Sequence, residues 1–206
     1  MKSINATSKL ILASQSRYRK ELLERLKLPF TCQSPLLNED ALKIELLKNG
    51  TEPGPLALRL AVAKAESVAR YEPGAWVLGS DQLLDLDGEI LGKAPTRTEA
   101  IAQITKLAGR AHDLVTAWTL IKKDSDKTEA HSSIHISKIH LRKLSTQEIS
   151  RYVDLEKPFD CAGSYKMESL GIALVESIET TDFTSIIGLP LLEVSRLLRQ
   201  IGFNVP

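Results

Sequence analysis

Short apolar runs alternate with amphipathic segments along this chain, and this alternation limits the possible folds more than any other feature. A continuous apolar run between polar residues predicts a buried strand, whereas apolar residues three or four positions apart predict a helix. Repeated alternation of the two predicts an α/β fold. Two hairpin signals interrupt the pattern, so we expect a mixed β-sheet flanked by helices rather than an all-parallel sheet.

The expected elements follow from this pattern and from the turn residues between them. The strands are expected at residues 10–13, 30–34, 76–80, 83–86, 89–91, 113–122, 128–141 and 171–178. The helices are expected at about residues 16–28, 55–70, 96–108, 145–155 and 188–201. Thr96 and Ser145 each begin a capping box, and the hairpins turn at Asp87-Gly88 and at residues 123–127.

The length of 206 residues predicts one domain spanning residues 1–206. A net charge of +1 provides no general attraction for nucleic acid or an anionic membrane. The apolar run near the N-terminus is too short for a signal sequence or a membrane span. Two cysteines without metal-ligand spacing favour a reduced, cytoplasmic protein, although a disulfide between Cys32 and Cys161 stays open.

Asp81 and Gln82 directly follow the apolar run 76–80, which predicts that they lie at a strand end. Ligands of open α/β sheets bind outside the carboxyl ends of strands, so a ligand site is one interpretation and an ordinary turn is the other. Glu39 lies in a predicted loop that could meet Asp81. Two such carboxylates could hold a divalent ion whose other ligands are water and substrate phosphate, while a solvated loop carboxylate is the alternative for each.

Ser14, Ser16, Arg17 and Arg19 lie where a predicted strand passes into a predicted helix. Free amide groups and the positive end of the helix dipole make such a junction an anion site, and arginines add charge-assisted contacts. The alternative is a solvated arginine pair with Ser16 as a plain N-cap.

Lys64 lies on the alanine-rich face of the helix at residues 55–70, the face that packs inward. Its ammonium must therefore meet an anion or extend to solvent. Lys93 follows a hairpin strand. The segment 88–93 is not a phosphate loop, because only three residues separate its glycines and Ala94 replaces the Ser or Thr that binds magnesium.

Neither the histidines nor the cysteines predict a metal or catalytic site. His131 and His135 share one face of the predicted strand at 128–141 and His140 the other, so the three are not a zinc ligand set. Cys161 has no evident base beside it, which favours a small buried side chain over a nucleophile.

Several short motifs occur in an order that resembles the Maf proteins, which are nucleoside triphosphate pyrophosphatases. The matching residues are 10–19, 38–39, 63–65, 79–82, 92–93, 161–166 and 187–190. The resemblance implies a bilobed mixed α/β fold with a deep central cleft. It also implies hydrolysis between the α and β phosphates to give a nucleoside monophosphate and pyrophosphate, and a possible homodimer.

The resemblance also assigns roles to individual residues. Asp81 matches the proton acceptor, and Glu39 with Asp81 matches the site of a divalent cation, Mg²⁺ or Mn²⁺. The positions that match phosphate-binding residues are Ser14, Arg19, Lys64 and Lys93.

Base preference in the family is attributed to three positions, which here are Tyr18, Gln82 and Glu168. Gln82 and Glu168 resemble the branch that acts on 7-methyl-GTP, whereas the dTTP and UTP branch typically has Thr and Gln there. A carboxylate accepts hydrogen bonds from the N1–H and amine of guanine, and an aromatic ring can stack on the cationic methylated base. This chain departs from the family where Arg17 replaces the usual Pro, Tyr18 the usual Trp, and Ala94 the usual Pro.

We therefore expect a 7-methyl-GTP pyrophosphatase that removes modified nucleotides before their incorporation. One alternative is a dTTP or UTP pyrophosphatase of the same family. Another is a non-catalytic nucleotide-sensing regulator of cell division, which would not need a water-activating carboxylate such as Asp81.

Overall fold

The structure is a computed structural model that describes residues 9–125 and 127–206. Its centre is a seven-stranded sheet in the order β2-β1-β3-β5-β6-β7, with β4 paired to β3 off this path. The strands are β1 (Leu10–Ala13), β2 (Thr31–Gln33), β3 (Trp76–Leu86), β4 (Glu89–Leu91), β5 (Ala111–Lys123), β6 (Thr128–Leu141) and β7 (Val175–Glu179). The two pairs made by β1 are parallel and the others are antiparallel, which confirms the predicted mixed sheet.

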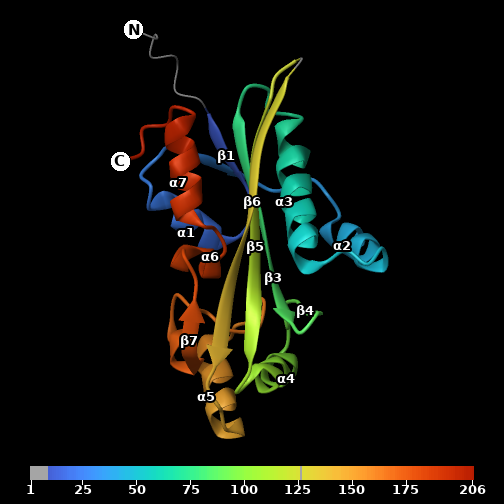
Figure 1. The fold of residues 1–206 in the computed structure, drawn as a ribbon, viewed down its shortest axis with the longest axis vertical. Coiled ribbons are helices and arrows are strands. Elements are labelled where there is room, and N and C mark those ends of the chain that lie inside the picture. The colour runs from blue at the N-terminus through green and yellow to red at the C-terminus, as the bar shows by residue number, and fades with distance from the viewer. Residues whose placement is uncertain (1–8, 126) are drawn as a thin grey trace.

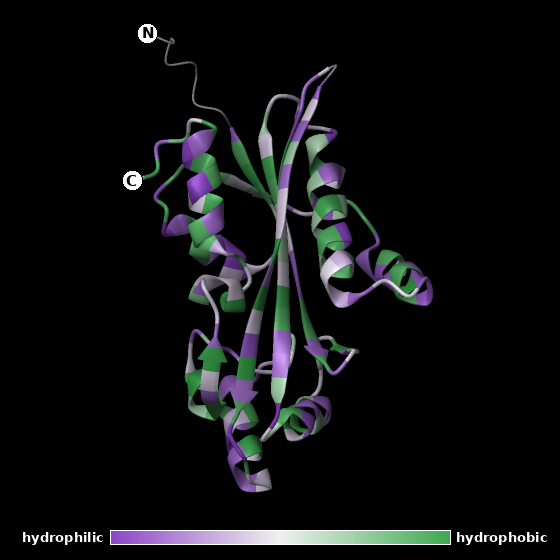
Figure 2. Ribbon diagram, viewed as in Figure 1, coloured by the Kyte–Doolittle hydropathy of each residue, from purple (hydrophilic) through white to green (hydrophobic). Residues whose placement is uncertain are grey.

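Helices cover both faces of this sheet. They are α1 (Arg17–Glu24), α2 (Glu39–Lys48), α3 (Pro53–Ala69), α4 (Arg97–Leu107), α5 (Thr146–Glu156), α6 (Phe183–Ile187), α7 (Leu191–Gln200) and the 3-10 helix η1 (Leu170–Leu174). In the upper half of Figure 1, α1, α6 and α7 lie on one side of the long strands and α2 and α3 on the other, while α4, α5 and β7 lie at the lower end. Figure 2 shows helices that carry both hydrophobic and hydrophilic residues, as expected where one side covers a sheet.

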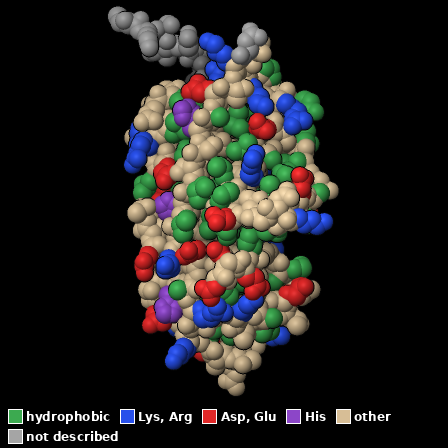
Figure 3. Space-filling view, turned by 45° about the vertical axis from the view of Figure 1, so that its right-hand side comes forward, with side chains coloured by type: hydrophobic (Ala, Val, Ile, Leu, Met, Phe, Trp, Pro, Cys, Tyr) green, Lys and Arg blue, Asp and Glu red, His purple; other side chains and the backbone are tan. Residues whose placement is uncertain are grey.

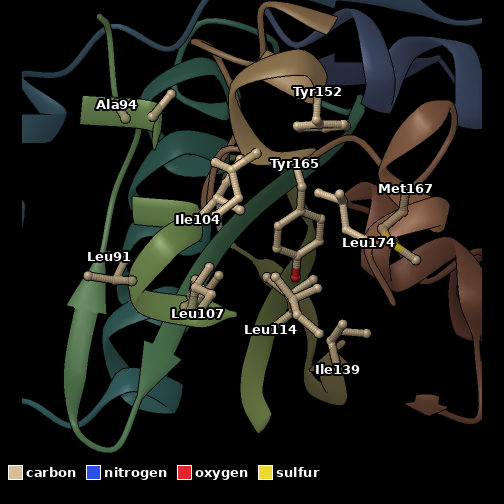
Figure 4. Packing of buried hydrophobic residues seen from close by; sticks show 14 of the residues in the cluster. Leu91, Ala94, Ile104, Leu107, Leu114, Ile139, Tyr152, Tyr165, Met167 and Leu174 are labelled. Carbon is tan, nitrogen blue, oxygen red and sulfur yellow. The ribbon is translucent and has the colours of Figure 1, made fainter. Parts of the chain in front are cut away.

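The two faces of β3 pack into different hydrophobic clusters because side chains alternate along a strand. Leu78 packs with leucines of α1 and α7, whereas its neighbour Val77 packs with Ala65 and Val68 of α3. A further cluster fills the lower end of the molecule. Tyr165 lies at the centre of the close-up of that cluster (Figure 4), among side chains from β5, α4 and η1.

Local sequence signals placed several elements correctly. Thr96 and Ser145 form capping boxes with Glu99 and Glu148 at the starts of α4 and α5. β3 and β4 form the hairpin predicted at Asp87-Gly88, and β5 and β6 form the longer one. The turn predicted at residues 123–127 includes Asp126, which lies outside the described residues.

Three expectations about elements are wrong. The strands predicted at 76–80 and 83–86 are one continuous strand, β3. Residues 39–48, expected to begin as a loop, form α2, and residues 171–174, expected to begin the strand at 171–178, belong to η1. The deep cleft between two lobes stays a prediction. No helix in the described parts of the chain combines the length and apolar character needed to cross a bilayer.

Candidate active site

One edge of β3 has no neighbouring strand in its middle part, among the strands that the structure describes. β1 pairs with β3 as far as Leu78, and β4 pairs with the same edge from Leu84 onwards. Within the described strands, residues 79–83 have no ladder partner on this edge, whereas β5 pairs with the opposite edge throughout. Asp81 and Gln82 lie in this gap, just past the carboxyl end of β1. The prediction that they lie at a strand end is wrong, because β3 continues beyond them and pairs with β5 as far as Asp85.

Lys64 forms the centre of a charged cluster on the α3 side of the sheet, with Asp81 and Glu39 as its partners. Lys64 Nζ lies 2.6 Å from Asp81 Oδ1 and 2.8 Å from Glu39 Oε1. The side chains of Lys64 and Asp81 are each only 7% exposed, whereas that of Glu39 is 46% exposed. Of the two interpretations of Lys64, the one in which its ammonium meets an anion is confirmed. Two carboxylates thus converge on a single cation, close to the open edge of β3.

Close packing of α3 on β3 places Lys64 at this point. A Cβ on Gly79 would lie 2.3 Å from the carbonyl oxygen of Ala61 and 2.9 Å from Cβ of Ala65. Only glycine permits this approach, because no real Cβ atom lies so close to a backbone oxygen. Since Ala61 and Ala65 flank Lys64 on the helix, the contact holds the ammonium of Lys64 against Asp81.

Glu39 reaches the cluster from the first position of α2. The Oδ1 of Asn38 accepts a hydrogen bond from the amide of Ala41 at 3.0 Å and so caps this helix. The prediction that Glu39 lies in a loop is wrong. Its carboxylate and that of Asp81 both contact the ammonium of Lys64, and the divalent-cation site expected between them stays a prediction. A carboxylate in the first turn is also favoured by the helix dipole.

The β1–α1 junction supplies further polar groups. Ser14 is buried, and its Oγ accepts a hydrogen bond from the amide of Ser16 at 3.1 Å. Ser16 in turn caps α1, and the Nε of Arg19 donates to the carbonyl oxygen of Gly188 at 3.0 Å. Burial lowers the pKa of Arg19, and the charges of Asp81 and Glu39 oppose this shift. Arg19 therefore lies within electrostatic reach of both carboxylates.

Lys93 is placed differently from the other predicted phosphate-binding residues. It is exposed, and its backbone forms an isolated bridge with Ala162. Its ammonium has no ion pair with Asp81 or Glu39 in the described part of the chain. Its role in phosphate binding stays a prediction.

Gln82 projects from the opposite face of β3, towards α6. Its Nε2 lies 2.9 Å from Thr116 Oγ1, 2.9 Å from the carbonyl oxygen of Ser185 and 3.0 Å from that of Ile186. Backbone carbonyls only accept hydrogen bonds, so the amide nitrogen must face them and Oε1 must face away. Gln82 can thus offer an acceptor to a ligand, and it does so on a different side of the strand from Asp81.

Tyr18 and Glu168, the other two predicted specificity residues, lie near the segment that precedes η1. The hydroxyl of Tyr18 donates to Asp160 Oδ2 at 3.2 Å. Partial desolvation raises the pKa of Glu168, while a backbone hydrogen bond and the charges of Lys166 and Arg17 act in the opposite direction. Glu168 remains exposed and is available to a ligand.

The cysteines and histidines offer no competing site. Cys32 and Cys161 are free thiols, and burial raises the pKa of Cys161 to about 12, so it stays protonated at neutral pH. His131 lies beside Glu129, whereas His135 contacts Thr180.

Several residues that position the site were not predicted from the sequence. Thr116 and the carbonyls of Ser185 and Ile186 hold Gln82, and the carbonyl of Gly188 holds Arg19. Backbone acceptors leave no sequence signal. Thr116 had one weak signal, since it is a polar residue within a long apolar strand.

Figure 3 shows acidic, basic and hydrophobic side chains interspersed over the face turned forward from the α2–α3 side. No large area of one sign covers this view.

The comparison with protein families agrees with this arrangement. A family model described as "Maf-like protein" matches residues 9–201. This chain belongs to the Maf family. Among individual Maf proteins, one from Xanthomonas oryzae pv. oryzae is 46% identical over 198 residues, covering 96% of this chain and 99% of the relative.

Two further relatives come from other bacteria. One from Bdellovibrio bacteriovorus is 44% identical and covers 93% of this Maf chain and 96% of its own length. One from Bordetella pertussis is also 44% identical, over 95% and 94% of the two chains. All three relatives are named 7-methyl-GTP pyrophosphatase.

Proposed function

We propose that this Maf protein is a pyrophosphatase that hydrolyses 7-methyl-GTP to 7-methyl-GMP and pyrophosphate. The observation that carries the proposal is the near full-length match, at up to 46% identity, to proteins named for this activity. The charged cluster at the open edge of β3 and the acceptor offered by Gln82 support it from the geometry. The same reaction on modified nucleotides would remove them before incorporation into nucleic acid.

Asp81 acts as the base that deprotonates the attacking water. Asp81 lies in the unpaired part of the β3 edge, and one oxygen of its carboxylate is held by Lys64. The ion pair fixes the orientation of the carboxylate, and its second oxygen can accept the proton of a water molecule. Fixed geometry of this kind supplies a large part of the rate in displacement reactions.

Asp81 and Glu39 fit a divalent cation, Mg²⁺ or Mn²⁺. Their oxygens already converge on one cation, the ammonium of Lys64, and carboxylate oxygens are the donors these metals prefer. No group of three or more His, Cys, Asp or Glu side chains suited to a metal occurs in the described residues, so water and phosphate would complete the coordination. When bound, the cation would polarise the triphosphate and stabilise the departing pyrophosphate.

Arg19, Lys64 and Lys93 neutralise the charge of the triphosphate. Arg19 is held by Gly188 at the edge of the site, and Lys64 lies within it. Ser14, at the carboxyl end of β1, adds a hydroxyl close to the same gap. Because these groups are fixed before substrate binds, they stabilise developing charge with little reorganisation.

Base recognition takes place on the Gln82 side of β3. The free Oε1 of Gln82 and the carboxylate of Glu168 are acceptors, which suit the N1–H and amine donors of guanine. The ring of Tyr18 would stack on the cationic methylated base. Triphosphate chemistry on one face and base recognition on the other require the nucleotide to pass around the open strand edge.

The protein is proposed to act in the cytoplasm and as a homodimer. Its free cysteines suit a reducing compartment, and its net charge of +1 provides no general electrostatic attraction for nucleic acid. Size-exclusion chromatography with light scattering tests the homodimer.

The decisive test of the chemistry is the Asp81→Asn variant, which keeps the size of the side chain and removes the base. We expect loss of metal-dependent pyrophosphate release from 7-methyl-GTP, with an unchanged circular dichroism spectrum and thermal unfolding within a few degrees of the parent. Asp85→Asn, on the same strand, is the matched control. Full activity in Asp81→Asn contradicts the role given to Asp81, and tight triphosphate binding without turnover in the parent protein favours a nucleotide sensor.

A further inference from the structure

One face of the Tyr18 ring is already covered by a cation of the protein itself. The guanidinium carbon of Arg17 lies 4.6 Å from the ring centroid. The Nη2 of Arg17 also donates a hydrogen bond to the Tyr18 hydroxyl at 2.8 Å. Arg17 therefore lies along the ring from its face to its hydroxyl, which is the position of a bound cation in a cation–π contact.

The ring beneath Arg17 is held in place. Tyr18 is partly buried, and its hydroxyl bonds to Asp160 Oδ2 at 3.2 Å while the thiol of Cys161 lies 3.7 Å away. Arg17, by contrast, is exposed and is the first residue of α1. The aromatic face is thus preorganised, whereas the cation above it can leave without disturbing a core.

We propose that Arg17 is a specificity-determining residue that competes with the base of 7-methyl-GTP for the face of the Tyr18 ring. This proposal rests on the proposed function of the protein. The methylated base carries a positive charge, so it must displace Arg17 from the ring and is repelled by its charge. The neutral base of GTP is not repelled, and a guanidinium can stack on it. Arg17 thereby reduces the preference for 7-methyl-GTP over GTP.

The expected effect is modest because the contact between Arg17 and Tyr18 is exposed to solvent. Loss of one such cation–π contact corresponds to about a two- to fivefold change in an affinity ratio. A general loss of attraction for triphosphate would lower the activity on both nucleotides alike. The ratio of kcat/KM for 7-methyl-GTP to kcat/KM for GTP therefore isolates the proposed competition.

The test uses Arg17→Ala and Arg17→Pro. Proline is well tolerated at the first position of a helix, so this variant removes the cation while preserving the start of α1. Arg25→Ala removes an exposed arginine at the other end of the same helix and serves as the control. We expect the ratio to rise about two- to fivefold in both Arg17 variants and to stay at the parent value in Arg25→Ala.

A second comparison tests whether Arg17 acts through the ring. In a Tyr18→Ala background the further change Arg17→Ala should leave the ratio nearly unchanged. An unchanged or lowered ratio in both single variants overturns the proposal, as does an equal rise in the Tyr18→Ala background. Dissociation constants for 7-methyl-GMP and GMP, measured by calorimetry, give the same ratio without turnover. Absence of 7-methyl-GTP hydrolysis by the parent protein would therefore refute the proposed function, while these constants would still decide the competition.

Discussion

Replacing Gly79 by Ala tests the contact that brings α3 against the site. The added Cβ would lie 2.3 Å from the carbonyl oxygen of Ala61, whereas real Cβ atoms stay at least 3.0 Å from such neighbours. The difference, 3.0 minus 2.3, requires a shift of at least 0.7 Å between α3 and β3. The clash involves backbone, so no side-chain rotation relieves it.

The shift acts directly on the charged cluster. Lys64 lies on α3 and Asp81 on β3, and their atoms are 2.6 Å apart. Overpacking of this kind lowers stability by about 1–3 kcal/mol. Because a misplacement near 1 Å lowers rates by up to about 100-fold, we expect kcat on 7-methyl-GTP to fall by about 10- to 100-fold in Gly79→Ala.

Urea unfolding and pyrophosphate release measure the two effects. Gly54→Ala is the matched control on the same helix, since its Cβ would lie 3.5 Å from Ile134 Cδ1, an ordinary contact. We expect this control to keep parental activity and to gain up to about 1 kcal/mol of stability. Parental kcat and stability in Gly79→Ala would refute the claim that this close approach sets the geometry of the site.

Three further predictions concern other parts of the structure. Lys64→Met leaves Asp81 buried without its cation, so activity should vanish and the free energy of unfolding in urea should fall by about 3 kcal/mol. Recovery of stability, without activity, in the Lys64→Met, Asp81→Asn double variant checks the cause. Burial lowers the pKa of His112 from 6.5 to about 4, so between these pH values the unfolded chain binds a proton that the native protein does not. The free energy of unfolding should therefore fall by about 3 kcal/mol as the pH drops through this window. His112→Gln should make the free energy of unfolding depend less on pH, and the same pH dependence in this variant and the parent would contradict the assignment to His112. Thr116→Val removes an anchor of Gln82 and should raise KM for 7-methyl-GTP about three- to tenfold with kcat nearly constant, whereas a fall in kcat alone would assign Thr116 another role.

Local signals in the sequence were sufficient where one element decides its own structure. The capping boxes at Thr96 and Ser145 and the turn at Asp87-Gly88 lie within a few residues of the elements they define. Lys64 was also informative, because a charged residue on a packed helix face requires a partner. The identity of that partner depended on the fold.

The extent of β3 could not be read from its residues. Ser80, Asp81 and Gln82 interrupt the apolar pattern, which predicts a strand end, yet β5 pairs with β3 from Trp76 to Asp85. β1 pairs with β3 only as far as Leu78, so these polar residues lie where the other edge of β3 has no ladder partner among the described strands. Their departure from the apolar pattern therefore misplaced the end of the strand, while the site proposed at these residues stays a prediction.

The helix α2 was missed for a different reason. None of its residues is buried, so it has no clear apolar stripe to predict it. Its N-terminal signal was present, since Asn38 is a good cap and two acidic residues follow it. The run at 170–178 illustrates a further limit, because a short apolar segment does not distinguish a strand from a 3-10 turn.

The orientation of Gln82 required the tertiary structure. Adjacent residues of a strand point to opposite faces, so sequence alone separates Gln82 from Asp81. The carbonyl oxygens of Ser185 and Ile186 in α6 accept hydrogen bonds from its amide nitrogen, and this contact orients Oε1 away from α6.

The central claim is tested most directly by product analysis across a nucleotide panel. The purified protein is given 7-methyl-GTP, GTP, dTTP and UTP with Mg²⁺ or Mn²⁺, and nucleotide products and pyrophosphate are quantified. We predict 7-methyl-GMP and pyrophosphate in equal amounts, with the highest kcat/KM for 7-methyl-GTP. Higher kcat/KM for dTTP or UTP, or release of orthophosphate with a nucleoside diphosphate, would contradict the account.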